Sequence, residues 1–366
     1  MVESRGFIER LHADPRSGVF VVTGGGSLLL SDLLTVPGAS ATVLDASVPY
    51  AAKALAEYIG AVPEQACSGT TARALAMRAF QRSVALAPAD IEHRFGFAIT
   101  ASLRTTATKR GEHRAFVAMQ TIASTQEWRF TLAKGKRSRA DEERVVRDLA
   151  LHALGAEPPA LDADDALVHV EAAAPTAWQK LFTGPDAIRA AGAKARPRIV
   201  FPGAFNPLHD GHRTIAALAA ERLAQPVTYE ICITNVDKPP LDCIDIVARL
   251  HEFSPTESVW LTRLPTFVEK VSAFRRATFL VGVDTIARIA DPKYYGGNGS
   301  ARDDAIAAIR AAGCRFLVFG RLINGRFVTL DDLPLPAALY DLSDGFSERE
   351  FRMDVSSTAI RKERSL

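Results

Sequence analysis

The sequence predicts an α/β protein made of two domains and a linker, and three observations carry this prediction. The chain has 366 residues, more than one domain usually contains. Short apolar runs alternate with segments of helical period in both halves, which is typical of sheets with helices packed on them. Between the halves, a stretch rich in Ala, Pro and Asp has the composition of a linker. We therefore expect domains at residues 1–155 and 196–366, joined by a linker over 156–195.

The overall composition indicates a globular protein of a reducing compartment. Hydrophobic residues make up 48% of the chain and charged residues 23%, and the net charge of +2 predicts neither nucleic acid nor a membrane as partner. The four cysteines form no C-x-x-C pair, so neither a disulfide framework nor a zinc site is indicated. Because no apolar signal segment and no apolar run of membrane-spanning length occurs, we expect the protein in the cytoplasm.

The N-terminal half opens with a strand, a glycine turn and a helix over residues 18–35. Three successive glycines, Gly24 to Gly26, precede this helix; such a turn can hold an anion, and it serves plain packing equally well. The apolar patterns predict further strands at residues 41–45, 95–100, 115–122 and 128–132, and helices at residues 51–58, 68–83 and 141–154.

Four stretches of this half resemble the CinA C-terminal family, whose active members are nicotinamide-nucleotide amidases. They are Thr23-Gly-Gly25, Val36-Pro-Gly-Ala-Ser40, Thr70-Thr-Ala-Arg-Ala-Leu-Ala-Met77 and Phe97-Ala-Ile-Thr100. The resemblance covers roughly residues 5–155 and implies a CinA-like α/β domain.

Two departures from that family predict that the amidase chemistry is lost. The position of the family's nucleophilic serine, two residues before the Thr-Gly-Gly, holds Val21, which has no group to activate. The family's glycine-rich T-G-x-A-G-P-G loop is replaced by residues 100–106. Ser27 is a candidate substitute nucleophile, but its place favours a helix N-cap or first-turn role. Tyr50 and Lys53 match the family's tyrosine and lysine only loosely, at a different spacing. Ligand binding or homo-oligomerisation is then the role left to this domain.

The C-terminal half alternates regularly between strands and helices, which predicts a Rossmann-like parallel sheet with helices on both faces. Strands are expected at residues 199–201, 227–234, 258–261, 278–283 and 315–319, and helices at residues 210–223, 245–253, 267–274 and 301–312.

One stretch of this half has the features of a phosphate site: Phe201-Pro-Gly-Ala-Phe-Asn-Pro-Leu-His-Asp-Gly-His212. It runs from a strand through a Gly/Pro turn into a helix, whose free N–H groups and dipole attract anions. Gly203 allows a close approach of the backbone, and Gly211 keeps bulk out of the first helical turn. His209 and His212 lie three residues apart and can face one ligand. No cysteine or carboxylate pair with ligand spacing stands nearby, so a metal site is not predicted.

This stretch resembles the G-x-F-x-P-x-H-x-G-H signature of the nucleotidylyltransferase superfamily, at every fixed position of that signature. Val281-Gly-Val-Asp284 resembles the superfamily's V-G-x-D strand end, and Val355-Ser-Ser-Thr-Ala-Ile-Arg361 resembles its second signature, I-S-S-T-x-I-R. Phe319-Gly-Arg321 resembles the strand-end arginine of adenylyltransferase members.

The resemblance implies transfer of a nucleotidyl group from a triphosphate to a phosphate-bearing acceptor, with release of pyrophosphate. The catalytic residues would be His209 and His212 at the α-phosphate, and Arg361 at the departing phosphates. Mg²⁺ would arrive with ATP. The nucleotide-binding residues would be Gly203, Ala204, Phe205, Gly211, Asp284, Arg321, Ser356, Ser357 and Thr358.

The sequence leaves the identity of the acceptor open. Lys238 follows a predicted strand and is a candidate to meet the acceptor's phosphate, and Tyr294 or Tyr295 is a candidate to stack on a base. The resemblance to nicotinamide or nicotinate mononucleotide adenylyltransferases favours a pyridine mononucleotide, although their usual tryptophan is absent. Phosphopantetheine, a phosphoalcohol with CTP, and a non-catalytic nucleotide sensor are the alternatives. A residual amidase is the weakest of them.

Overall fold

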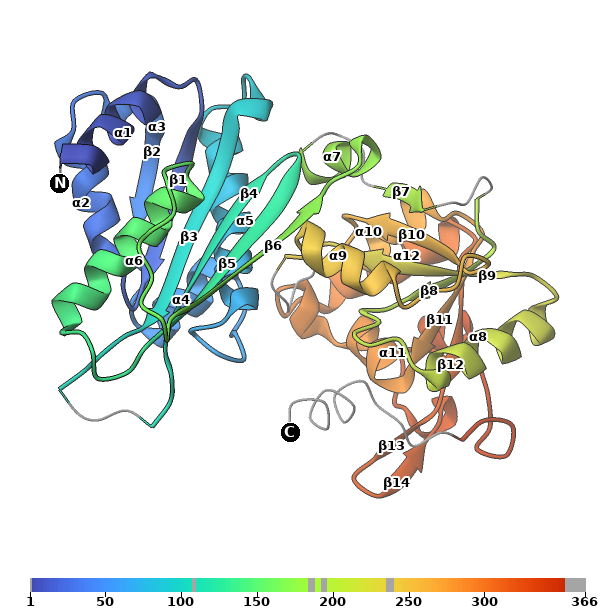
Figure 1. Ribbon diagram of the computed structural model, residues 1–366. Helices are drawn as coiled ribbons and strands as arrows, with labels where there is room; N and C mark the ends of the chain where they lie inside the picture. The colour runs from blue at the N-terminus through green and yellow to red at the C-terminus, as the bar shows by residue number, and fades with distance from the viewer. Residues whose placement is uncertain (1, 107–109, 184–187, 192–195, 235–239, 353–366) are drawn as a thin grey trace. The chain divides into compact units, whose positions relative to one another are not determined.

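The computed structural model describes residues 2–106, 110–183, 188–191, 196–234 and 240–352 (Figure 1). By its internal contacts the chain divides into two compact units. The N-terminal unit comprises Met1–Pro185 and Val236–Val247, and the C-terminal unit comprises Asp186–Asn235 and Ala248–Leu366. Each unit has its own sheet and its own core.

A mixed sheet forms the centre of the N-terminal unit, with strand order β2-β1-β3-β4-β5-β6. Strand β1 pairs in parallel with β2 and β3, and the remaining neighbours are antiparallel. The strands are β1 (Ser17–Thr23), β2 (Val43–Ser47), β3 (Arg94–Ser102), β4 (His113–Thr121), β5 (Ser124–Leu132) and β6 (Ala166–Ala173).

Helices cover both faces of this sheet, because parallel neighbours need crossover connections that lie on the faces. The described helices are α1 (Val2–Ala13), α2 (Ser27–Thr35), α3 (Ala39–Thr42), α4 (Ala52–Ile59), α5 (Gly69–Leu86), α6 (Arg139–Ala153), α7 (Thr176–Thr183) and the 3-10 turn η1 (Ile91–His93). Apolar side chains of α1, α2 and α6 form one core with the sheet, and those of α4 and α5 form a second core on the opposite face.

Two segments of this unit differ from the sequence-based expectation. Residues 166–173, expected in a linker, form β6 and pair with β5 along its length. Most β6 residues are exposed, so the strand lacks the alternation of buried apolar residues that marks a strand in a sequence. Residues 39–42, where a strand was expected to begin, form the short helix α3 behind the left-handed Gly38, and β2 starts after it.

The C-terminal unit is built on a sheet of strand order β15-β12-β11-β8-β9-β10-β7. All neighbours are parallel except β10 and β7, which confirms the predicted parallel sheet. The strands are β7 (Ile188–Ala191), β8 (Ile199–Pro202), β9 (Val227–Cys232), β10 (Ser258–Thr262), β11 (Thr278–Gly282), β12 (Arg315–Phe319) and β15 (Ser343–Gly345), with β13 (Arg321–Ile323) and β14 (Arg326–Val328) as a separate hairpin.

The helices of this unit lie on both faces of its sheet. Apolar residues of α10, α11, α12 and α13 pack with one face, and a cluster of aromatic rings fills the other face beside α8. The described elements are α8 (Asp210–Leu223), α10 (Phe267–Ala273), α11 (Val283–Ala290), α12 (Gly299–Ala311), α13 (Ala337–Tyr340) and the 3-10 turns η2 (Pro292–Tyr295) and η3 (Leu330–Asp332). Helix α9 (Cys243–Leu250) has its first five residues in the N-terminal unit and its last three in the C-terminal unit.

The order of the strands creates a switch point between β8 and β11. From β8 the chain adds β9 and β10 on one side, then returns to add β11 and β12 on the other side of β8. Because the connections on either side of β8 leave in opposite directions, the carboxyl ends of β8 and β11 are the position where open α/β sheets bind their ligands. None of the helices in the described ranges combines the length and apolar character needed to cross a membrane.

Candidate functional site

The turn after β8 is the first component of the candidate site. Gly203 opens it, and its N–H donates to the carbonyl of Glu230 on the neighbouring strand at 2.9 Å. A Cβ at Gly203 would lie 2.5 Å from the Phe205 ring, so glycine is required for the ring and the backbone to approach this closely. The turn is thereby held against the sheet at the carboxyl end of β8.

Phe205 anchors this turn in the aromatic cluster. Its side chain is 1% exposed and lies edge-on to Phe201, Tyr229 and Phe253, with ring centroids 5.3–5.6 Å apart. Its φ of 43° places a bulky residue in the left-handed region, which costs conformational energy and persists where surrounding packing enforces it. The ring also lies edge-on to His212 at 5.0 Å, so the anchor orients a predicted catalytic residue.

His209 and His212 are brought together at the start of α8. Their rings stack with centroids 3.8 Å apart and an angle of 27° between planes. His209 is the N-cap residue, and its backbone N–H donates to Nδ1 of His212 at 3.3 Å. Since Nδ1 of His212 accepts this bond, the proton of the neutral imidazole belongs on Nε2.

Both histidines are neutral at pH 7. Burial lowers the pKa of His212 to about 3, with His209 and Arg213 as further causes. Burial also lowers the pKa of His209, against the opposing charge of Asp210. Nδ1 of His209 is buried and has no hydrogen-bond partner among the described residues. A buried polar atom without a partner is costly, so it indicates a group that a ligand completes.

Asp284 and Arg321 form the second component of the site. Asp284 lies in the first turn of α11, directly after β11, and Arg321 follows β12. Nη1 of Arg321 lies 3.3 Å from Oδ2 of Asp284, and each side chain is about half exposed. Because β8, β11 and β12 are consecutive neighbours in a parallel sheet, the pair and the histidine turn share one edge of it.

Arg249 is a site residue that the sequence did not reveal. It lies in the last turn of α9, and its Nη1 donates to the carbonyl of Ala204 at 2.9 Å. This bond attaches the glycine turn at a second point, next to the bond from Gly203 to Glu230. No motif marks Arg249, because an arginine on an amphipathic helix has the same pattern whether its guanidinium binds a loop or faces water.

Several predicted residues are not joined to this site by the structure. Tyr294 lies in η2 with 39% of its side chain exposed, and Lys293 approaches its ring at 4.9 Å. Asp284 lies in the first turn of α11, so the rest of that helix separates it in sequence from Tyr294. Its neighbour Tyr295 donates to the carbonyl of Ile289 at 3.2 Å. Outside the described residues lie Lys238, Ser356, Ser357, Thr358 and Arg361, which stay predictions.

In the N-terminal unit, the helix start after the glycine turn is occupied by a carboxylate of the same chain. Val21 is fully buried in the core beside α4 and α5 and offers no reactive group. The N–H and Oγ of Ser27, the first residue of α2, both donate to Oε1 of Glu143 at 2.7 and 2.8 Å. Glu143 therefore serves as the cap of α2, and Ser27 has the first-turn role that its position favoured.

The described residues contain no group of three or more His, Cys, Asp or Glu side chains that could hold a metal ion.

Comparisons with known proteins bear on each half separately. Residues 200–363 match the family model described as cytidylyltransferase-like, a span that contains both signatures. The search of curated proteins found no relative of this chain.

Solved structures of CinA-type proteins were also found. The competence/damage inducible protein CihA from Agrobacterium tumefaciens is 20% identical, with a TM-score of 0.34 over 42% of this chain and 93% of that chain. A CinA superfamily protein from Escherichia coli is 20% identical, with a TM-score of 0.32 over 42% of this chain and 88% of that chain. One from Enterobacter cloacae is 17% identical, with a TM-score of 0.34 over 41% and 89%.

The turn with His209 and His212 lies at the switch point of a parallel sheet, and the Asp284–Arg321 pair lies at the same edge. The family match over residues 200–363 includes the turn and the pair. Residues 200–363 therefore form a cytidylyltransferase-like domain, and this match supports nucleotidyltransferase activity for the C-terminal part of the chain.

Proposed function

We propose that the C-terminal unit transfers an adenylyl group from ATP to a pyridine mononucleotide, nicotinamide or nicotinate mononucleotide. A phosphate oxygen of the acceptor attacks the α-phosphorus of ATP, the bond from that phosphorus to the bridging oxygen of the β-phosphate breaks, and pyrophosphate leaves. The observation that carries the proposal is the stacked, neutral pair His209 and His212 at the N-terminus of α8.

The geometry suits stabilisation of charge on the α-phosphate. With Nδ1 of His212 accepting the backbone N–H of His209, Nε2–H of His212 is a donor for an oxygen that gains charge in the transition state. A donor held in place by stacking and by the edge of Phe205 needs no reorganisation when that charge develops. His209 contributes a second ring whose buried Nδ1 has no partner among the described residues.

The remaining groups of the nucleotide site have distinct roles in this proposal. Asp284, oriented by Arg321, contacts the nucleoside. Ser356, Ser357, Thr358 and Arg361 hold the β- and γ-phosphates through hydroxyl groups, a helix N-terminus and a planar guanidinium. Mg²⁺ enters as part of MgATP and takes its ligands from phosphate oxygens and water.

The acceptor site is proposed from two residues and one resemblance. Lys238 is proposed to meet the acceptor's phosphate and Tyr294 to stack on its base. Tyr294 is 39% exposed and would stack on an aromatic ligand that extends along α11. The resemblance of the N-terminal half to nicotinamide-nucleotide amidases favours a pyridine nucleotide by association alone.

A second candidate follows from the matched family itself. Its description as cytidylyltransferase-like favours CTP with a phosphoalcohol acceptor over ATP with a pyridine mononucleotide. The two candidates share the histidine turn and differ in the nucleoside and in the acceptor.

Pyrophosphate release with each nucleoside triphosphate and each acceptor decides between them. The full chain is assayed with ATP or CTP against nicotinamide mononucleotide, nicotinate mononucleotide, phosphopantetheine and phosphorylated alcohols. We expect turnover with ATP and one of the two pyridine mononucleotides, and formation of the corresponding dinucleotide. Turnover only with CTP would establish the second candidate, and no turnover with either pyridine mononucleotide would refute the first.

A further inference from the structure

The sheet of the C-terminal unit has a hollow at its amino edge, where β8 and β11 begin. The hollow has a volume of about 360 Å³. Its lining comes from the starts of the two strands, from the end of α8 and from the segments next to them: Arg198, Ile199, Leu223, Gln225, Arg276 and Thr278. The N–H of Thr278 donates to the carbonyl of Arg198 at 2.8 Å, so the chain is firmly paired beneath this hollow.

The hollow and the turn with His209 and His212 lie at opposite edges of one sheet. Strands β8 and β11 are parallel neighbours, with Thr278 beside Ile199 at their starts. Both strands run from the hollow toward the candidate site, and the five residues of β11 span about 16 Å. A ligand in the hollow would therefore occupy a site separate from the one proposed for nucleotidyl transfer.

The lining of the hollow contains two guanidinium groups and no carboxylate. Within the part of the chain that the structure describes, the side chains of Arg198 and Arg276 form no hydrogen bond or ion pair. Two unpaired charges of one sign that share a hollow raise the positive potential inside it, which attracts an anion.

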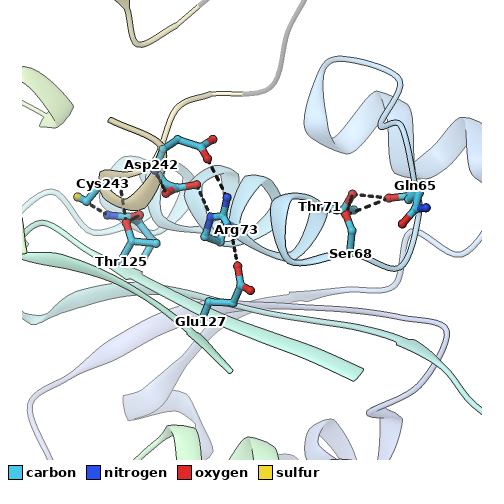
Figure 2. Close-up of polar contacts among 10 residues, drawn as sticks. Gln65, Ser68, Thr71, Arg73, Thr125, Glu127, Asp242 and Cys243 are labelled. Carbon is cyan, nitrogen blue, oxygen red and sulfur yellow. Dashed lines mark hydrogen bonds and ion pairs between the residues drawn. The ribbon is translucent and has the colours of Figure 1, made fainter. Parts of the chain in front are cut away.

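Arg73 of the N-terminal unit shows the opposite arrangement. It is 8% exposed, and Figure 2 shows its guanidinium between Glu127 and Asp242. Asp245 supplies a third carboxylate at 2.8 Å. The carboxylates of its own unit thus neutralise this arginine, as a buried charge requires.

The backbone of Arg276 gives an independent indication that its side chain has a role. Its φ of 60° lies in the left-handed region, which costs conformational energy for a residue with a Cβ. Its N–H donates to the carbonyl of Ala312 at 3.0 Å, and a Cβ at Gly313 would lie 3.2 Å from its Cγ. Glycine would adopt this conformation more easily, so an arginine here suggests that the guanidinium is needed.

We propose that the hollow is a second anion site, which binds a phosphate-bearing small molecule through Arg198 and Arg276. Planar guanidinium groups suit phosphate because they donate paired hydrogen bonds to its oxygens. Gln225 and Thr278 add an amide and a hydroxyl group to the lining. The volume lies at the lower end of the range for small-molecule sites. The proposal is independent of the proposed function, since the hollow would bind its ligand even in a protein that transferred no nucleotide.

Titration of the free full-length protein with inorganic tripolyphosphate, without Mg²⁺, tests the proposal. Calorimetry measures the affinity, and hydrogen–deuterium exchange locates the bound anion. We expect slower exchange over residues 196–200 and 275–280, and binding there about tenfold weaker in Arg198→Met and in Arg276→Met. The matched control is Arg275→Met, an exposed arginine outside the lining, which should leave the affinity within twofold of the wild type. Exchange over residues 203–212 reports binding at the histidine-containing turn separately.

Arg276→Gly separates the binding role from a role in folding. Because glycine adopts a φ of 60° without strain, this variant should unfold at a urea concentration at least as high as the wild type and still lose tripolyphosphate binding in the hollow. Wild-type affinity in Arg276→Gly would overturn the proposal. Equal weakening by Arg275→Met would do so too, because it would show general attraction to a basic surface, as would protection confined to residues 203–212. No step of the test uses turnover, so its failure and a failure of nucleotidyl transfer are observed separately.

Discussion

The two units contain the same local arrangement, a strand, a glycine turn and a helix, and they treat the helix N-terminus in opposite ways. At α2 the chain supplies its own anion, because Glu143 accepts two hydrogen bonds from Ser27. At α8 the chain places two neutral histidines, and Nδ1 of one of them has no partner among the described residues. A strand–turn–helix is thus only a potential anion site, and the side chains at the helix N-terminus decide whether a ligand can use it.

Among the changes that test this difference between the turns, His212→Ala is expected to have the largest effect. Loss of the Nε2–H donor should lower kcat for pyrophosphate release about 10²- to 10⁴-fold and leave MgATP binding within a few fold. Steady-state kinetics and calorimetric titration with MgATP measure the two quantities. Ser27→Ala is the matched control in the other turn and should leave kcat unaltered. A His212→Ala protein with wild-type turnover would contradict the assigned role and favour a non-catalytic nucleotide sensor.

Gly203→Ala is expected to disturb the same turn through packing. The new methyl group would lie 2.5 Å from the Phe205 ring, which is held by other aromatic side chains, so the ring and His212 beside it must shift. We expect a loss of about 1–3 kcal/mol in unfolding free energy of the C-terminal unit, together with weaker MgATP binding.

Chemical denaturation with and without MgATP measures both effects of Gly203→Ala. Gly24→Ala provides the comparison, because its Cβ would lie 2.0 Å from the Ala101 carbonyl at a φ of +73°. It should destabilise the N-terminal unit by a similar amount. Unchanged stability in Gly203→Ala would show that the turn adapts easily and that the close approach is not required.

The pH dependence of stability also distinguishes the two turns, because the C-terminal turn contains a histidine whose pKa is lowered. The pKa of His212 is about 3 in the folded protein, below its usual value of 6.5, so the unfolded chain binds the proton more tightly. Its contribution to stability is complete above pH 6.5 and is lost as the pH falls toward 3.

Between pH 7.5 and 5.5 this loss should amount to about 1 kcal/mol. Urea unfolding at the two pH values, compared between the wild type and His212→Gln, isolates the His212 contribution. We expect a smaller pH dependence in the variant. An identical slope in both proteins would mean that His212 titrates normally.

The smallest effect is expected from Glu143→Gln in the N-terminal turn. The amide oxygen can still accept the bonds from Ser27, but the favourable interaction of a negative charge with the N-terminus of α2 disappears. We expect a loss of about 0.3–1 kcal/mol, seen as a lower melting temperature, and no change in kcat for pyrophosphate release. A large kinetic effect would show that the two turns are coupled.

Much of this contrast was open to prediction from local sequence signals. Glycine turns flanked by strand and helix patterns marked both helix starts. The parallel sheet followed from the alternation of elements and is confirmed. The edge strand β6 was not predicted, because backbone pairing with β5 holds it in place and most of its residues are exposed.

By itself the sequence determined where the histidines lie relative to a strand and a helix, since a turn and its cap are set by residues a few positions apart. The tertiary structure alone decided what occupies each helix N-terminus and which elements hold the turn. Ser27 and Glu143 are 116 residues apart, and Arg73 and Asp242 are 169 residues apart. Such pairs leave no periodic signal in the chain, because a buried ion pair depends on distances that exist only after the cores of the units have formed.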